Sequence, residues 1–281
     1  MRIVATHELP GPAWARLPDG VVVGRIEDAE ILIGMNEPVP FDAMPSLRLV
    51  ANFSVGYDAI DVAECRRRGI VLTNTPGVLD AAVADLTFAL ILAARRRLVE
   101  GDMLIRRGEW KAPEFLGREV SGTTLAIVGM GRIGSVVARR AAGFDMHVVE
   151  VTSRSGNLDD ALRAADVVSV HTPLNDATRG LISRERLALL QDGATFVNTA
   201  RGAVVDEDAL VDELVSGRIG AGLDVFVHEP HVPERLYGLP NVVLAPHIAS
   251  ATVETREAMA SLVVDNVLAF LAGRPLPTEV A

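Results

Sequence analysis

The chain has 281 residues, of which 49% are hydrophobic and only 4% aromatic, and its formal net charge at pH 7 is −10. This length accommodates two domains with sizeable cores, and the composition is that of a globular α/β protein. The acidic balance argues against nucleic-acid binding, which needs a basic face. One cysteine, Cys65, excludes an internal disulfide; no signal peptide precedes the first apolar run, and no run is long enough for a membrane span. We therefore expect a cytoplasmic protein that binds neither nucleic acid nor a membrane.

Short apolar runs recur through the first part of the chain and predict buried parallel strands. They lie near residues 2–5, 21–24, 31–34, 47–51 and 70–73. Between them the apolar spacing is helical, most clearly over residues 58–68 and 81–97, and Gly69 favours a helix end. Strands that alternate with helices predict a doubly wound α/β domain. The largely polar stretch 101–113 predicts a helix and loop that cross to another domain.

A second series of strands and helices begins at Thr124. The predicted strands cover residues 124–128, 146–151, 167–170, 194–197, 219–223 and 242–245. The first of these strands is followed by a predicted helix over residues 133–142, and Asn157 and Asp206 are predicted to cap later helices. The last helix is predicted over residues 252–271, because Gly273 and Pro275 end its apolar period.

These patterns predict two doubly wound parallel-sheet domains, one inserted in the other. A flavodoxin-like substrate domain comprises residues 1–99 plus 252–281, and a Rossmann dinucleotide-binding domain comprises residues 100–251. Two crossings of the chain, near residues 99–101 and 249–251, predict a hinge with a cleft between the lobes.

The glycines Gly129, Gly131 and Gly134 form a G-x-G-x-x-G pattern between a predicted strand and a predicted helix. Glycines let the backbone approach a pyrophosphate, and a helix N-terminus offers unpaired N–H groups and a positive dipole. The pattern therefore predicts dinucleotide binding in this context. A methyltransferase with a similar turn is the alternative, although it leaves Arg201 and His247 unexplained.

The end of the next predicted strand indicates which dinucleotide binds. An NAD site usually has an acidic residue there for the ribose 2′-hydroxyl, but this chain has Thr152, Ser153 and Arg154. An arginine flanked by hydroxyls suits a 2′-phosphate, so we predict a preference for NADP, with NAD possible. Glu150 would serve as the acidic residue if the strand ended earlier.

Charged side chains follow three later strands and match the needs of 2-oxo acid reduction. Arg201 offers a planar fork for a substrate carboxylate, and His247 can donate a proton to the ketone oxygen. Glu229 can favour the charged imidazole by lying beside it. Because parallel strands end at one sheet edge, the three are predicted to converge. His228 and His231 are weaker candidates for the acid, and the proline between them opposes a metal site.

The chain resembles the D-isomer-specific 2-hydroxyacid dehydrogenases over nearly its whole length. The resemblance is carried by residues 52–61, 73–79, 129–134, 170–174, 198–202, 222–230 and 246–247. It implies that Arg201, Glu229 and His247 are the catalytic residues. It also implies that the backbone N–H groups of Val55 and Gly56 bind the substrate carboxylate.

The resemblance further implies a cofactor site and a dimer formed through the nucleotide-binding domain. Beyond the glycines and residues 152–154, this site is expected to include Val83, Arg132, Ile133, His171, Pro173, Thr199 and Asp224. Met35 and Phe53 are expected to shape the substrate pocket. Within the family, the sequence looks most like the NADP-preferring hydroxyphenylpyruvate, hydroxypyruvate and glyoxylate reductases. Asp80-Ala81 departs from the usual Thr-Asp pair near the cofactor.

Two functions are therefore compatible with the sequence. The first is reduction of a small 2-oxo acid, such as glyoxylate, hydroxypyruvate or a substituted pyruvate, to the D-2-hydroxy acid with NADPH. The second is a dinucleotide-sensing regulatory protein on the same fold, which the presence of the catalytic residues does not exclude. The identity of the substrate substituent cannot be inferred from the sequence.

Overall fold

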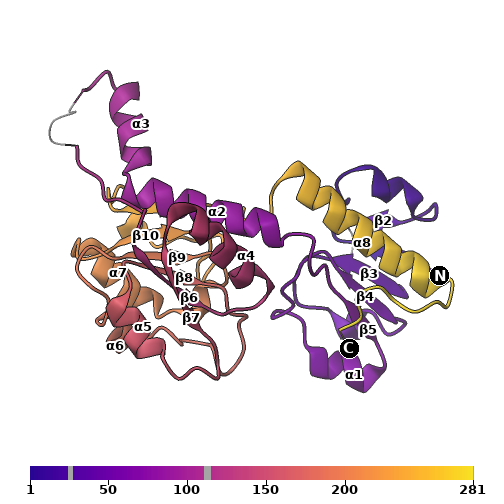
Figure 1. The fold of residues 1–281 in the computed structure, drawn as a ribbon. Helices are drawn as coiled ribbons and strands as arrows, with labels where there is room; N and C mark the ends of the chain where they lie inside the picture. The colour runs from indigo at the N-terminus through magenta and orange to yellow at the C-terminus, as the bar shows by residue number, and fades with distance from the viewer. Residues whose placement is uncertain (25–27, 111–114, 281) are drawn as a thin grey trace. The chain divides into compact units, whose positions relative to one another are not determined.

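The computed structural model describes residues 1–24, 28–110 and 115–280, which form two compact units (Figure 1). Unit 1 comprises Met1–Leu79 and Ser250–Ala281, and unit 2 comprises Asp80–Ala249. The division falls at Leu79 rather than at the expected residue 99, so the second helical segment belongs with the second series of strands and helices. The return to unit 1 at Ser250 lies close to the expected crossing.

Unit 1 is a five-stranded parallel sheet in the order β2-β1-β3-β4-β5, which is the flavodoxin-like order. Its elements are β1 (Ile3–Ala5), η1 (Pro12–Arg16), β2 (Val22–Val23), β3 (Ile31–Gly34), η2 (Phe41–Ala43), β4 (Leu49–Asn52), α1 (Val62–Arg68), β5 (Val71–Thr73) and α8 (Val253–Leu271). One core joins the sheet to α1 through Leu32, Val50 and Cys65. The long helix α8 packs against η1 and β4 (Figure 1).

Local sequence signals set the ends of the helices in unit 1. Asp61 caps α1 by accepting a hydrogen bond from the N–H of Glu64, and Gly69 ends it at φ 67°. The side chain of Thr252 likewise accepts from the N–H of Thr255 at the start of α8. These ends agree with the helices predicted from the sequence.

Unit 2 is a six-stranded parallel sheet in the order β11-β10-β9-β8-β6-β7. Its elements are α2 (Asp80–Arg95), α3 (Leu98–Arg106), β6 (Thr124–Val128), α4 (Arg132–Ala141), η4 (Ala142–Phe144), β7 (His147–Val151), α5 (Leu158–Ala164), β8 (Val167–Val170), α6 (Arg184–Leu187), β9 (Thr195–Asn198), η5 (Gly202–Val204), α7 (Glu207–Val215), β10 (Gly220–Leu223), η6 (Glu234–Leu236) and β11 (Val242–Leu244). The strand order reverses between β6 and β8, and this switch point is where ligands bind in doubly wound sheets.

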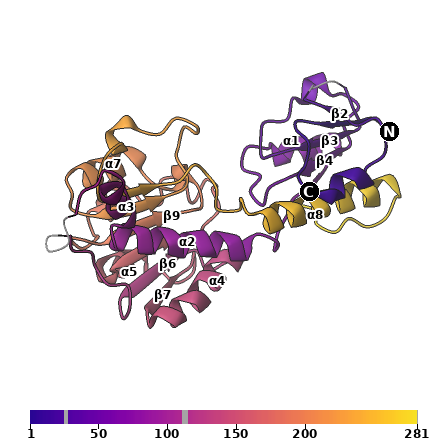
Figure 2. The ribbon, with the colours of Figure 1, turned by 90° about the horizontal axis from the view of Figure 1, so that it is seen from above.

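Helices cover both faces of this sheet. Along β6, Leu125 and Ile127 point into a core with α2 and α4, whereas Ala126 and Val128 point into a core with α5, α6 and α7. Figure 2 shows α2 running along the sheet of unit 2. A Cβ atom at Gly222 would lie 2.7 Å from Cβ of Leu90, so the small residues of β10 allow α2 to pack closely. This packing explains why α2 belongs to unit 2.

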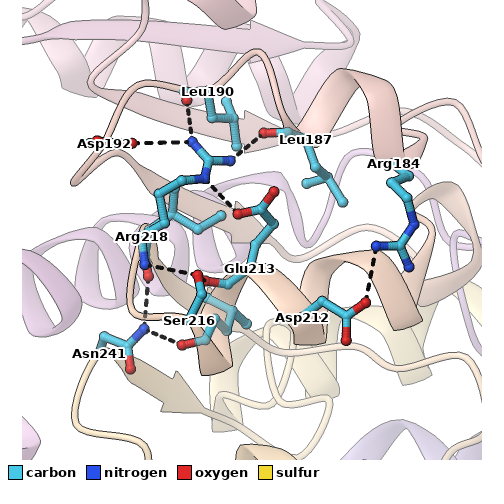
Figure 3. A network of polar contacts seen from close by, with 11 residues as sticks. Arg184, Leu187, Leu190, Asp192, Asp212, Glu213, Ser216, Arg218 and Asn241 are labelled. Atoms are coloured by element: carbon cyan, nitrogen blue, oxygen red, sulfur yellow. Dashed lines mark hydrogen bonds and ion pairs between the residues drawn. The ribbon is translucent and has the colours of Figure 1, made fainter.

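A network of polar contacts ties α7 to the loops beside it (Figure 3). The guanidinium of Arg218 donates to the carbonyl oxygens of Leu187 and Leu190 and pairs with Glu213 at 2.6 Å. The side-chain amide of Asn241 donates to the carbonyl oxygens of Leu214 and Ile219. The network therefore satisfies carbonyl groups at the ends of α6 and α7.

Two local predictions differ from the structure. Asn157 precedes α5 but its side chain does not cap the helix; its amide donates instead to the carbonyl oxygen of Glu150 at 3.2 Å. Residues 101–106 of the stretch 101–113 belong to α3 within unit 2 rather than to a bridge between the units, and residues 111–113 lie outside the described part of the chain. Asp206, by contrast, caps α7 as predicted, through the N–H of Ala209.

None of the helices within residues 1–24, 28–110 and 115–280 combines the length and apolar character needed to cross a bilayer. The helix α3 nevertheless carries exposed apolar side chains, with Met103 52% and Ile105 55% accessible. Exposed apolar groups concentrated on one helix are typical of a surface that meets another protein.

Candidate active site

The glycine loop lies between β6 and the first turn of α4, at the switch point of unit 2. Gly129 has φ +106°, and a Cβ atom there would lie 2.7 Å from the backbone of His171. At Gly134 a Cβ atom would lie 2.1 Å from the carbonyl oxygen of Gly129, so this glycine allows the helix to pack against the loop. Gly131 faces open space, with no atom within 4 Å of an added Cβ. These are the three roles expected of a pyrophosphate-binding loop.

The start of α4 fits the phosphate groups of a dinucleotide. Gly131 is the N-cap, and no side chain of the described residues caps the helix. The first-turn N–H groups, including those of Arg132 and Ile133, therefore remain available to an anion. Open space over Gly131 lets the pyrophosphate approach them.

The loop after β7 carries hydroxyls and an arginine in place of an acidic residue. Thr152 Oγ1 accepts hydrogen bonds from the N–H groups of Arg154 and Ser155, at 3.3 and 3.1 Å. Thr152, Ser153 and Arg154 are all exposed. Because β7 continues to Val151, Glu150 lies inside the strand rather than at its end. The strand therefore does not end early enough for Glu150 to take the acidic position.

Further expected cofactor residues follow β8 and β9, at the same edge of the sheet as the glycine loop. His171 follows β8, its Nε2 lies 2.8 Å from Ser169 Oγ, and burial lowers its pKa to about 4. Its ring is therefore neutral at pH 7. Thr199 follows β9 and contacts Thr87 of α2, with 3.2 Å between the hydroxyl oxygens. Pro173 is exposed after His171.

Asp224 follows β10, and its hydrogen bonds hold the loop that contains His247. The carboxylate is fully buried and accepts hydrogen bonds from the N–H groups of Ile248 and Ala249, at 2.8 and 2.9 Å. Burial raises the pKa of Asp224, and these two N–H groups partly oppose that rise. The N–H of His247 donates to the Asp224 carbonyl oxygen at 2.9 Å. Asp224 therefore holds the loop that positions His247.

Glu229 and His247 form a close pair at the same edge of the sheet. The Nδ1 atom of His247 lies 2.6 Å from Oε2 of Glu229, and Oε1 accepts from the N–H of Phe226 at 3.0 Å. Burial acts to raise the pKa of Glu229, but the hydrogen bonds from His247 and Phe226 outweigh it and lower the pKa. The pair leaves Nε2 of His247 as the ring atom for proton transfer, since Nδ1 is occupied.

Arg201 approaches this pair from the end of β9. Its charge is one of the influences that lower the pKa of Glu229, and its Nη1 donates to the carbonyl oxygen of Ala200 at 2.8 Å. The next residue, Gly202, is packed against the loop after β10, where a Cβ atom would lie 2.1 Å from the backbone of Phe226. Gly202 was not among the expected site residues, although its place after Arg201 at a strand end is the signal that could have found it.

Unit 1 contains a separate loop that fits a carboxylate. The carbonyl oxygens of this loop are all fixed: Asn52 Nδ2 donates to those of Ser54 and Gly56, and Asn74 Nδ2 donates to that of Val55. The N–H groups of Val55 and Gly56 have no acceptor among the described residues. Two adjacent free N–H groups on a loop that is held in place by hydrogen bonds to its carbonyl oxygens are typical of an anion-binding site. The two asparagines are functional candidates that the motif did not single out.

Met35 and Phe53 differ in their access to this loop. Met35 follows β3 and is 40% exposed, as expected of a residue that can meet a ligand. Phe53 is only 2% exposed, so its ring lies beneath the surface and supports the side chains that cover it. Val83 of α2 is likewise buried, at 4% exposure.

The described part of the chain contains no group of three His, Cys, Asp or Glu side chains that could hold a metal ion. His228 and His231 lie opposite one another in an isolated β-bridge. The Glu229–His247 pair is suited to acid–base chemistry, and the unpaired N–H groups at the start of α4 and at Val55 and Gly56 are suited to anion binding.

Comparisons with known proteins agree with this geometry. Residues 88–249 match the profile of the D-isomer-specific 2-hydroxyacid dehydrogenase NAD-binding domain. The glyoxylate reductase of Thermococcus kodakarensis is 46% identical, over 96% of this chain and 88% of the relative. The hydroxyphenylpyruvate reductase of Plectranthus scutellarioides is 46% identical, over 85% of this chain and 80% of the relative.

Among solved structures, an NADPH-dependent glyoxylate/hydroxypyruvate reductase from Sinorhizobium meliloti, in complex with NADP and malonate, has a TM-score of 0.90 and 38% identity. The similarity covers 100% of this chain and 96% of that one. The fold and site define a nicotinamide-dinucleotide-dependent oxidoreductase. The chain belongs to the D-isomer-specific 2-hydroxyacid dehydrogenase family, as its motifs indicated.

Proposed function

We propose that this enzyme reduces a small 2-oxo acid to the D-2-hydroxy acid with NADPH, and that glyoxylate and hydroxypyruvate are among its substrates. The observation that carries the proposal is the Glu229–His247 pair, with 2.6 Å between Oε2 and Nδ1, on the same sheet edge as the glycine loop. The names of the similar reductases support the choice of substrates.

Each residue of the site has a role in this reaction. The nicotinamide, when bound, supplies the hydride. His247 donates a proton from Nε2 to the oxygen of the ketone as that oxygen gains negative charge. Glu229 keeps His247 oriented and favours its charged form, and Arg201 holds the substrate through its carboxylate. The free N–H groups of Val55 and Gly56 bind the same carboxylate.

The preference for NADPH rests on the loop after β7. A 2′-phosphate would be repelled by a carboxylate but can accept hydrogen bonds from Arg154 and from the hydroxyls of Thr152 and Ser153. Replacing the arginine in Arg154→Ala should lower kcat/KM for NADPH about 10- to 100-fold and leave that for NADH nearly unchanged. An equal loss with both cofactors would contradict the role given to Arg154.

The proposed reaction is tested by incubating the protein with NADPH or NADH and a set of 2-oxo acids. We expect NADPH oxidation with glyoxylate and hydroxypyruvate, and loss of it in His247→Ala. His228→Ala is the matched control, because His228 is an exposed histidine next to Glu229 and should retain activity. Tight NADPH binding without turnover of any 2-oxo acid would favour the regulatory alternative.

We further propose that the enzyme is a homodimer that works in the cytoplasm. The resemblance implies a dimer through the nucleotide-binding domain, and α3 of unit 2 supplies exposed apolar side chains at Met103 and Ile105. The double substitution M103E/I105E should convert the dimer to a monomer in analytical ultracentrifugation. A wild-type protein that sediments as a monomer at micromolar concentration would refute the dimer.

A further inference from the structure

The segment that follows α8 returns to the sheet of unit 1 and pairs with β5. This strand is at the edge of the sheet, in the order β2-β1-β3-β4-β5. Thr73 and Glu279 form an antiparallel bridge, and the N–H of Val280 donates to the carbonyl oxygen of Leu72 at 2.8 Å. The pairing covers an edge that would otherwise expose unpaired backbone groups. Residues 278–280 are therefore fixed directly beside the end of β5.

The side chain of Thr278 connects this segment to α8 and to the residue that follows β5. Its hydroxyl accepts a hydrogen bond from Nδ2 of Asn266 at 2.8 Å and donates to the carbonyl oxygen of Asn74 at 2.6 Å. The backbone carbonyl oxygen of Thr278 accepts from the N–H of Asn74 at 3.3 Å. Both backbone polar groups of Asn74 are therefore held by the same residue.

Asn266 fixes the position of Thr278 from within the core. The side chain of Asn266 projects from α8 and is fully buried. Its Oδ1 accepts from the N–H of Thr278 at 3.2 Å, and its Nδ2 also donates to the carbonyl oxygen of Leu262 at 2.8 Å. A buried amide whose oxygen and nitrogen are both engaged is held in one orientation. The long helix of unit 1 thereby holds the Thr278 hydroxyl in place.

Asn74 in turn holds the loop that is proposed to bind the substrate carboxylate. Its Nδ2 donates to the carbonyl oxygen of Val55 at 3.0 Å, and the N–H of Thr75 donates to that of Ser54 at 3.0 Å. Each of these carbonyl groups shares a planar peptide unit with the N–H of the next residue. Fixing the two carbonyls therefore fixes the directions of the N–H groups of Val55 and Gly56.

We propose that Thr278 is a positioning residue for substrate binding, because its hydroxyl, through Asn74, fixes the two N–H groups that receive the carboxylate of the 2-oxo acid. The inference rests on the proposed function. The hydrogen bonds form a continuous chain from Asn266 of α8 through Thr278 and Asn74 to Val55, and in such a chain each bond strengthens the next. Without the hydroxyl, the carbonyl oxygen of Asn74 loses its donor and the loop is held less firmly.

This role predicts a distinct kinetic effect. The carboxylate is bound in the substrate complex and in the transition state alike, so a loosened loop raises KM for the 2-oxo acid and leaves kcat nearly unchanged. NADPH is proposed to bind at the glycine loop of unit 2, so KM for NADPH should stay the same. A purely structural role would instead lower the melting temperature without a selective rise in KM for the 2-oxo acid.

The test compares wild type with Thr278→Val, which keeps the branched shape of the side chain and removes its hydroxyl. We expect KM for glyoxylate and for hydroxypyruvate to rise about 3- to 10-fold, the effect of one hydrogen bond, with kcat changed by less than about twofold. Oxamate has a carboxylate beside a carbonyl group and is not reduced. Its dissociation constant, measured by calorimetry on NADPH-saturated protein, should rise by the same factor. Thr278→Ser keeps the hydroxyl and should restore the wild-type values.

Two other substitutions in unit 1 are matched controls. Glu279→Gln alters the exposed side chain next to Thr278 and preserves the backbone bridge to Thr73, so it should leave every constant unchanged. Asp61→Ala removes the N-cap of α1 and should lower the melting temperature without raising KM for the 2-oxo acid. The second control measures what destabilising unit 1 does by itself.

The results distinguish the role of Thr278 from the proposed function. Unchanged KM values in Thr278→Val, or equal rises in Thr278→Val and Thr278→Ser, would overturn the role of the hydroxyl while reduction of 2-oxo acids stands. The same rise in Asp61→Ala, or an equal rise in KM for NADPH, would also overturn it. If Thr278→Val does not fold, Thr278→Ala removes the same hydroxyl and decides the question. No turnover of any 2-oxo acid by wild type would refute the proposed function, and oxamate binding would then test Thr278 separately.

Discussion

The Glu229→Gln substitution tests the acid–base pair most sharply. Glutamine keeps the shape of the side chain and an oxygen that can accept from the N–H of Phe226, which is 3.0 Å away in the wild type. It removes the negative charge that lies 2.6 Å from Nδ1 of His247. The substitution therefore changes the charge of the pair with little change in packing.

The size of the effect follows from the hydrogen bond and its exposure. A charge-assisted hydrogen bond contributes about 1.5–3 kcal/mol when shielded from water. The side chains of Glu229 and His247 are 35% and 47% exposed, so solvent screening reduces this to about 1–2 kcal/mol. That free energy corresponds to a roughly 5- to 30-fold loss in kcat/KM for reduction.

The pH profile gives a second readout with a definite sign. The carboxylate stabilises the protonated imidazole, which is the proton donor for reduction, so removing it should move the alkaline fall in kcat/KM to lower pH. Steady-state rates of NADPH oxidation between pH 5 and 9 measure both effects.

Glu207→Gln is the matched control for this experiment. The Glu207 carboxylate accepts a hydrogen bond from the N–H of Val227 at 2.8 Å, on the same loop, while the carboxylate that contacts His247 is that of Glu229. We expect its pH profile to match that of wild type. If Glu229→Gln had the same rate and pH profile as Glu207→Gln, the role given to Glu229 would be refuted.

Four further substitutions test the cofactor loop and the stability of each unit. Gly131→Ala should raise KM for NADPH by roughly 10- to 100-fold at unchanged melting temperature, because the added methyl takes the space needed by the pyrophosphate. Gly134→Ala should instead lower the melting temperature, since its Cβ would lie 2.1 Å from a carbonyl oxygen. Hydrogen bonds from two arginines of α1 lower the pKa of Glu64 to about 2 from 4.5, so its contribution to stability is complete above pH 4.5 and is lost as the pH falls toward 2. The difference in melting temperature between wild type and Glu64→Gln should therefore shrink over that range, and a constant difference would contradict the assignment. Arg218→Met should cost about 2–3 kcal/mol by leaving two carbonyl oxygens unsatisfied, lowering the melting temperature by about 5–10 °C without changing kcat at 25 °C.

Local structure was the part of the fold that the sequence predicted well. Strand positions follow from short apolar runs, and the helix ends at Gly69, Asp206 and Thr252 follow from capping chemistry that acts within a few residues. Asn157 shows the limit of such signals. Its Oδ1, which would have to accept from the helix, accepts a hydrogen bond from the Ser155 hydroxyl instead, while its amide donates to the carbonyl oxygen of Glu150.

The boundary between the units depends on packing that no single segment specifies. The helical period of α2 predicts a helix but not the sheet that it covers. The close approach of Leu90 to Gly222 determines that choice, and these residues lie far apart in the sequence. The small residues of β10 are compatible with a helix packed closely above them, but they do not identify the helix.

The residues of the candidate site likewise fall into those that the sequence predicted and those that it did not. Strand ends and motifs predicted the residues of unit 2, because parallel strands bring their carboxyl ends to one edge. Asn52 and Asn74, whose side-chain amides hold the carbonyl oxygens of the Val55–Gly56 loop, were not assigned a role from the sequence. Their role depends on hydrogen bonds across the loop, which cannot be seen without coordinates.

The most direct test of the proposed activity is the reduction of hydroxypyruvate and glyoxylate by the purified protein, followed by NADPH absorbance with chiral analysis of the product. We expect one D-glycerate to form for each NADPH oxidised with hydroxypyruvate, and kcat/KM to be higher with NADPH than with NADH. No oxidation of either cofactor with any 2-oxo acid, or formation of L-glycerate, would contradict the proposed activity.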